Sequence, residues 1–120
     1  APTIAFAPDG RVLAFGSPGG STIITTVVGI ATNLIDFDLT FPDAIAAPRF
    51  SQRNGATTTA EADGAEYVSQ LSQLGHQFRT VAEIGAAAGV QLFPDGRIQA
   101  AAEPTRRGGG AAIVVKDSSQ

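Results

Sequence analysis

The sequence GSPGGS at residues 16–21, followed directly by TIITTVVGIATNLID at residues 22–36, decides how the first third of this chain folds. Residues 22–28 are rich in β-branched side chains, a composition typical of a strand. The apolar residues nevertheless recur at the i, i+3, i+4 spacing of a helix, over a span too long for a typical strand. These residues are Ile24, Val27, Val28, Ala31, Leu34 and Ile35. We therefore predict a buried helix here, with Ser21 as its N-cap.

Two copies of the tetrapeptide Pro-Asp-Gly-Arg, at residues 8–11 and 94–97, predict two β-hairpins. Proline presets the backbone angle of a turn and glycine accepts a positive φ, so each copy is a strong turn signal. Residues 3–7 and 11–15 flank the first copy, and residues 90–93 and 97–101 flank the second. One recurrence does not define a repeat array, so we predict two separate hairpins.

A short helix is predicted at residues 41–47 from its end signals. Thr40 is the expected N-cap, Asp43 completes a capping box, and Pro48 ends the helix because proline disfavours the helical conformation of the residue before it.

Another helix should follow residue 63, where Asp63 and Glu66 form a second capping pair. Its apolar stripe comprises Tyr67, Val68, Leu71 and Leu74. Gly75 is placed where a left-handed C-cap belongs.

Strands are expected at residues 57–60, 77–81 and 111–115, and Gly108 to Gly110 should let the backbone turn before the last of them. Hairpins mixed with helices predict an α+β fold in which helices pack on a mixed sheet. We predict a folded portion at residues 1–115 and a loose polar tail at residues 116–120.

Composition excludes several classes of function. The chain has 120 residues, enough for one domain, and only 16% of them are charged against 43% hydrophobic, which favours a piece with apolar faces meant for partners. A net charge of -3 argues against nucleic-acid binding. The absence of cysteine excludes thiolate catalysis and disulfides. We expect no membrane span, because the longest apolar stretch is too short, and no export signal is visible.

The two adjacent glycines Gly19 and Gly20 are the candidate site. They leave a strand and open a helix, so their backbone N–H groups can face outward with the positive end of the helix dipole behind them. Such a turn can hold an anion or a developing oxyanion. The alternative is that these glycines only allow the chain to turn. The stretch lacks the lysine and spacing of a nucleotide-binding phosphate loop.

Other polar residues are interpreted as structural. His76 follows the end of a predicted helix, where a surface role is expected. Arg49 should be buried and paired, because a guanidinium ties loops together by bidentate hydrogen bonds. Asp36, Asp38 and Asp43 do not have the spacing of a calcium loop, so we predict no metal site and no cofactor.

Several motifs together resemble the γ-glutamyltranspeptidase family, in their order and spacing. They are Pro2-Thr3-Ile4, GSPGGS at residues 16–21 with IITTV at 23–27, Ala44-Ile45, Ala47-Pro48-Arg49, Leu74-Gly75-His76 and Arg106-Arg107-Gly108-Gly109. The resemblance covers about residues 1–115 and corresponds to the C-terminal part of the family's small subunit.

The resemblance implies an N-terminal-nucleophile hydrolase of stacked α, β, β and α layers, made as two subunits by self-cleavage of one precursor. In that family a threonine attacks a γ-glutamyl amide such as glutathione, and the acyl group passes to water, an amino acid or a peptide. Carried over by position, Gly19 and Gly20 bind the substrate and supply the oxyanion hole. The implied partners are the large subunit and the N-terminal part of the small subunit, and the implied location is extracytoplasmic.

Two departures from the family pattern limit what this chain can do alone. It begins with Ala1, which has no hydroxyl, so the nucleophile is not in this chain and we expect the isolated chain to be inactive. The segment at residues 103–106 departs from the Asp-Pro-Arg expected near the end, so no catalytic role is assigned there.

Two alternatives stay open at this point: a related acylase, such as one acting on β-lactam side chains, and a non-catalytic α+β module that binds a small anion or a partner. The codons upstream of Ala1 would discriminate between an enzyme and such a module.

Overall fold

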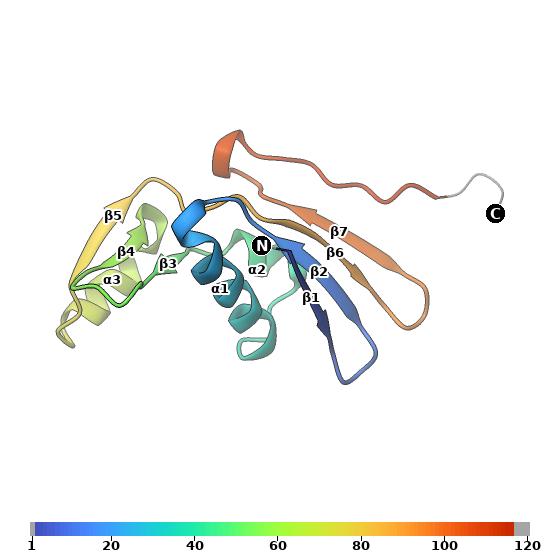
Figure 1. The fold of residues 1–120 in the computed structure, drawn as a ribbon, viewed down its shortest axis with the longest axis horizontal. Coiled ribbons are helices and arrows are strands. Elements are labelled where there is room, and N and C mark those ends of the chain that lie inside the picture. Colours follow the sequence, from blue (N-terminus) through green and yellow to red (C-terminus); the bar gives the residue numbers. More distant parts are fainter. Residues whose placement is uncertain (1, 117–120) are drawn as a thin grey trace.

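The computed structural model describes residues 2–116, which form two sheets joined by helices (Figure 1). The first sheet is antiparallel and contains, in order, β1 (Thr3–Phe6), β2 (Val12–Gly16), β6 (Ala88–Leu92) and β7 (Ile98–Ala102). The second contains β3 (Phe50–Ser51), β4 (Thr58–Glu61) and β5 (Phe78–Val81), with β4 and β5 parallel. The helices are α1 (Ile23–Ile35), α2 (Phe41–Ala46) and α3 (Ala65–Ser72), with 3-10 turns η1 (Gly20–Thr22), η2 (Ala62–Gly64) and η3 (Arg106–Gly108). The predicted α+β class is confirmed.

Both predicted hairpins are confirmed, and they close with the same turn. Gly10 N–H donates to Ala7 O at 3.0 Å, and Gly96 N–H donates to Phe93 O at 3.0 Å. The inner strands of the two hairpins, β2 and β6, pair with each other, so the two hairpins together make the four-stranded sheet.

The helix predicted after the GSPGGS stretch is confirmed as α1, but its burial and its cap differ from the prediction. Thr26 and Ile30 are the buried residues of α1, whereas Ile24 and Ile35 are 75% and 78% exposed. Ser21 is not the N-cap, because η1 comes first and no side chain caps α1. A helix that is apolar on most sides buries one face here and leaves another open.

The end signals of the two other helices are confirmed only in part. Thr40 caps α2, since its hydroxyl accepts a hydrogen bond from Asp43 N–H at 3.3 Å. The capping pair proposed for α3 is wrong: Gly64 precedes α3 and no side-chain cap bond forms, because the chain enters α3 through the tight turn η2. Gly75 has φ 96°, as expected of a left-handed residue after a helix.

The core lies between α1, α2 and one face of the four-stranded sheet. It contains Leu13, Phe15, Ile30, Phe41, Ala44, Ile45, Ala87 and Ala101. Alternate residues of a strand point to opposite faces, so the other face of the sheet carries the intervening side chains. That second face is apolar and open: Ile4 and Phe6 are 64% and 79% exposed, and Val90, Leu92 and Ile98 are exposed as well.

The strand predicted at residues 111–115 is wrong. Figure 1 shows this segment running back beside β7, but it joins no sheet and has no regular structure. A β-branched composition makes a strand only where a neighbouring strand supplies ladder hydrogen bonds. Of the predicted tail at 116–120, Lys116 is exposed and residues 117–120 lie outside the described residues. Among residues 2–116, no helix is long and apolar enough to cross a membrane.

Candidate functional site

The Gly19-Gly20 turn connects the end of β2 to the start of α1. Gly19 has φ 138° and Gly20 has φ 55°, conformations that side-chain-bearing residues seldom adopt. Thr22 holds the turn from the helix side, since both its N–H and its hydroxyl donate to Gly19 O, at 3.1 Å and 3.0 Å. The backbone conformation of the turn therefore requires glycine at both positions. The sequence motif alone did not establish this.

The N–H groups of Gly19 and Gly20 donate to no other group within residues 2–116. Gly20 is exposed and Gly19 is half-buried, so neither residue of the turn is enclosed in the core. They precede the 13-residue helix α1, whose dipole favours negative charge at this end. The turn can accept an anion or a developing oxyanion without breaking an existing bond.

The segment between β5 and β6 (residues 82–87) supports the turn from behind. Ala86 N–H donates to the Ser17 hydroxyl at 3.0 Å, and the Ser17 hydroxyl donates to Pro18 O at 2.7 Å. Gly85 packs so closely here that a Cβ on it would lie 2.5 Å from the Ser17 oxygen. Ser17 itself is 7% exposed.

A buried cluster of four charges, Arg49, Glu61, Glu103 and Arg106, fixes that supporting segment. Arg106 pairs with Glu61 at 2.6 Å and with Glu103 at 2.7 Å, and Arg49 pairs with Glu103 at 2.5 Å. The carboxylates also hold backbone amides of the segment: Glu61 accepts from Ile84 N–H and Glu103 accepts from Ala87 N–H, both at 2.7 Å. Both arginines also donate to Ile45 O of α2, Arg49 at 2.8 Å and Arg106 at 2.9 Å, so the cluster joins α2, the end of β4, the residue after β7 and residues 82–87.

Burial and hydrogen bonding act in opposite directions on the charges of the cluster. Burial acts to raise the pKa of Glu61, but hydrogen bonds from Arg106 and from two backbone amides outweigh it, so this pKa lies below its ordinary value of 4.5. Burial acts to lower the pKa of Arg106, yet its bonds to Glu61 and Glu103 hold that pKa above the ordinary range. Burial and the nearby charge of Arg106 lower the pKa of Arg49. The directions for Glu61 and Arg106 fit an ion pair in which both groups are charged.

The prediction that Arg49 is buried and paired is confirmed, but its partners were not foreseen. Glu61 ends β4, Glu103 directly follows β7 of the other sheet, and Arg106 belongs to the segment that received no role. Only Glu103 and Arg106, three positions apart, carried a local pairing signal; the rest needed the tertiary structure.

The remaining polar candidates stand apart from the turn. His76 is exposed after α3, with its ring 6.4 Å from that of Phe78. Asp43 takes part in the α2 cap through its backbone. Within the described part of the chain, no three His, Asp or Glu side chains gather as a metal site would require.

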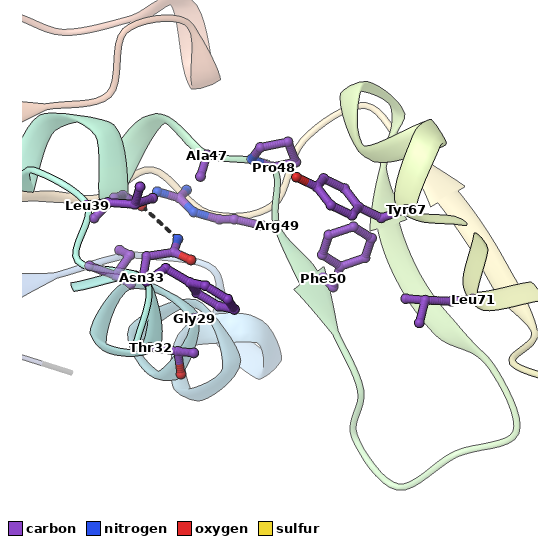
Figure 2. A pocket seen from close by; sticks show the side chains of 13 residues that line it. Gly29, Thr32, Asn33, Leu39, Ala47, Pro48, Arg49, Phe50, Tyr67 and Leu71 are labelled. Carbon is purple, nitrogen blue, oxygen red and sulfur yellow. Dashed lines mark hydrogen bonds between the residues drawn. The ribbon is translucent and has the colours of Figure 1, made fainter. Parts of the chain in front are cut away.

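A separate apolar pocket of about 520 Å³ lies between α1 and the second sheet. Figure 2 shows the rings of Phe50 and Tyr67 on one side and Asn33 and Leu39 on the other, with Asn33 bonded to Ala44 O at 3.2 Å. None of the residues lining this pocket belongs to the Gly19-Gly20 turn. We place the candidate chemistry at the turn, because the residues lining the pocket include no His, Asp, Glu, Lys or Cys that could act as a general base or activate the hydroxyls of Thr32 and Tyr67.

The family model described as Gamma-glutamyltranspeptidase matches residues 1–113, nearly the whole chain and all of the features above. The chain belongs to the gamma-glutamyltranspeptidase family.

Two curated relatives are glutathione hydrolase proenzymes. That of Bacillus subtilis (strain 168) is 31% identical over 119 residues, covering 96% of this chain and 20% of the relative. That of Escherichia coli (strain K12) is 30% identical over 105 residues, covering 86% of this chain and 18% of the relative. The chain thus spans about a fifth of the length of these gamma-glutamyltranspeptidase-family precursors.

Solved structures of the family share the fold. A mutant of Helicobacter pylori gamma-glutamyltranspeptidase superposes with a TM-score of 0.78 at 33% identity, covering 88% of this chain and 60% of that one. The enzyme from Pseudomonas nitroreducens, complexed with L-DON, gives a TM-score of 0.81 at 25% identity, covering 97% of this chain and 62% of that one. The predicted assignment to this family and its N-terminal-nucleophile hydrolase fold is confirmed.

Proposed function

We propose that this chain is part of the small subunit of a γ-glutamyltransferase or glutathione hydrolase, and that Gly19 and Gly20 bind its substrate and form its oxyanion hole. The observation that carries the proposal is the pair of N–H groups, on two residues that are not buried just ahead of α1, that have no hydrogen-bond partner within residues 2–116. Membership of the gamma-glutamyltranspeptidase family supports the reaction class.

The chemistry of the proposal is acyl transfer. A threonine hydroxyl from a part of the precursor outside these 120 residues attacks the γ-carbonyl carbon of a γ-glutamyl amide, and its proton passes to the threonine's own α-amino group. The carbonyl oxygen becomes an oxyanion that accepts hydrogen bonds from Gly19 and Gly20. The amine then leaves with that proton, and water or an amino acid cleaves the acyl ester. On this proposal the isolated chain is inactive.

The open face of the four-stranded sheet supports the view that other parts of the precursor complete the fold. Ile4 and Phe6 on β1 and Ile98 on β7 form an apolar surface that a soluble protein seldom leaves uncovered. We propose the large subunit and the N-terminal part of the small subunit as its cover. The extracytoplasmic location implied by the family resemblance remains part of the same proposal.

The test of the oxyanion role is Gly20→Val in the full-length protein, assayed with a γ-glutamyl anilide. A β-branched residue at φ 55° resists the turn and displaces the amide, so kcat should fall about a hundredfold or more. Gly108→Val is the matched control: Gly108 also has a positive φ and open space for a Cβ, but it lies in another turn.

Two outcomes decide the proposal. Loss of turnover in Gly20→Val with near-normal turnover in Gly108→Val supports it. Near-normal turnover in Gly20→Val, with the protein folded and processed, removes Gly19 and Gly20 from the site.

A second candidate is an acylase of β-lactam side chains. The observation in its favour is the likeness to cephalosporin acylase from Bacillus halodurans, with a TM-score of 0.75 at 26% identity over 87% of this chain. Parallel assays of the full-length protein with a γ-glutamyl anilide and with an acylated cephalosporin distinguish the two substrates, because the Gly19-Gly20 turn would serve either reaction.

A further inference from the structure

We propose that the hydroxyl groups of Ser17 and Thr22 are positioning groups that set the direction of the two N–H groups in the turn. This inference rests on the proposed oxyanion role of Gly19 and Gly20. It concerns two side chains whose hydroxyl groups donate to backbone carbonyls of the turn.

The argument begins with the planarity of the peptide bond. A peptide unit is rigid, and in its trans form the C=O of one residue points opposite to the N–H of the next. The Gly19 N–H therefore shares a plane with Pro18 O, and the Gly20 N–H shares a plane with Gly19 O. Any group that fixes one of these carbonyl oxygens also fixes the amide on the other side.

Each of the two carbonyl oxygens is held by a side-chain hydroxyl. The Ser17 hydroxyl donates to Pro18 O at 2.7 Å, and the Thr22 hydroxyl donates to Gly19 O at 3.0 Å. Gly19 O also accepts from Thr22 N–H at 3.1 Å, so its plane is held twice while that of Pro18 O is held by Ser17. A bond to the carbonyl also polarises the peptide unit and strengthens its N–H as a donor.

The direction of the Ser17 hydroxyl is itself fixed by a hydrogen bond from the segment at residues 82–87. It accepts from Ala86 N–H at 3.0 Å, which leaves its own hydrogen for Pro18 O. Ala86 lies between Ile84 and Ala87, whose amides are held by Glu61 and Glu103. The buried charge cluster is therefore connected to the Gly19 amide through the segment at residues 84–87 and the Ser17 hydroxyl.

The test uses hydroxyl-deleting variants of the full-length protein with a γ-glutamyl anilide. We expect Ser17→Ala to lower kcat about tenfold, and Thr22→Val to lower it less because Thr22 N–H still holds Gly19 O. KM should change less than kcat, since these N–H groups bind the oxyanion of the transition state more strongly than the carbonyl oxygen of the bound substrate.

Thr25→Val is the matched control, because it deletes the hydroxyl of another half-buried threonine near the start of α1. The Thr25 hydroxyl contacts Thr22 O at 3.1 Å and the Ser51 hydroxyl at 2.7 Å, and neither group belongs to the two peptide planes. We expect Thr25→Val to lower the melting temperature about as much as Thr22→Val does, while kcat stays near that of the unmodified protein.

A double variant separates positioning from general damage. If Ser17 acts only through the Gly19 N–H, Ser17→Ala combined with Gly19→Ala, which strains the backbone at φ 138° and displaces that amide, should be no slower than Gly19→Ala alone. Multiplied effects would overturn the inference. So would Ser17→Ala and Thr22→Val variants whose kcat matches that of Thr25→Val.

The two proposals fail in different ways. If Gly20→Val retains turnover, the oxyanion role itself is wrong. If Gly20→Val loses turnover while Ser17→Ala and Thr22→Val keep it, the oxyanion role stands and only the positioning role is wrong.

Discussion

The chain contains two turns in which adjacent glycines both have positive φ, but the amides of the two turns differ in their hydrogen bonds. Gly19 and Gly20 have φ of 138° and 55°, and Gly108 and Gly109 have φ of 82° and 80°. In the second turn, Gly109 N–H donates to Arg106 O at 3.0 Å, and the next amide donates to Glu103 O at 2.8 Å. In the first turn, neither glycine amide has a partner within residues 2–116.

The difference shows that adjacent glycines with positive φ do not by themselves make an anion site. The second turn uses its amides to satisfy carbonyls beside the buried charge cluster, so it is a structural turn. The first turn leaves its amides unbonded at the start of a 13-residue helix, which is the condition for binding negative charge. The two turns are distinguished by the hydrogen-bond partners of their N–H groups, and not by their amino-acid composition.

The largest expected effect on stability comes from removing the side chain that anchors the second turn. Arg106→Ala leaves Glu61 and Glu103 buried without their main partner, so the free energy of unfolding should fall by about 3–5 kcal/mol. Arg97→Ala is the control, because Arg97 pairs with Asp95 on an exposed hairpin and its loss should cost less than about 1 kcal/mol.

Chemical denaturation of the full-length protein measures both variants. An Arg106→Ala variant as stable as Arg97→Ala would mean that the charge cluster does not anchor the second turn. The interpretation of the second turn as a structural turn would then be wrong.

A smaller effect is expected within the second turn itself. A Cβ on Gly109 would lie 2.7 Å from Pro104 O, at φ 80° and ψ 173°, whereas a Cβ on Gly108 meets nothing within 4 Å. Gly109→Ala should cost about 2–3 kcal/mol, because that backbone region is nearly exclusive to glycine. Gly108→Ala should cost about 1 kcal/mol. Melting temperatures compare the two, and equal losses would contradict the packing argument.

The smallest effect is expected from pH, and it appears only in acid. The pKa of Glu61 lies below its ordinary value of 4.5 in the folded chain, so its ion pairs add stability above that value. This contribution should decline as the pH falls below about 4.5, through the folded pKa. The stability advantage over Glu61→Gln should therefore be constant from about pH 5 to about pH 8 and shrink below that range. An advantage that grew in acid would mean that Glu61 is protonated in the fold.

Local signals predicted most of the regular structure. The two Pro-Asp-Gly-Arg turns gave both hairpins, and the i, i+3, i+4 spacing outweighed β-branched composition in α1, because a helix of 13 residues requires one apolar face. Capping predictions were weaker. Thr40 was right, whereas Ser21 and the Asp63–Glu66 pair were wrong, since 3-10 turns shifted the starts of both helices.

By itself, the sequence determined where the chain turns and which stretch carries the candidate site, because glycine, proline and helical periodicity act over a few neighbouring residues. Only the tertiary structure decided which glycine amides are unbonded, that residues 111–115 form no strand, and that Arg49, Glu61, Glu103 and Arg106 meet. The physical reason is that hydrogen-bond and ion-pair partners come together across the fold, from residues as far apart in the sequence as Ser17 and Ala86, which are 69 positions apart.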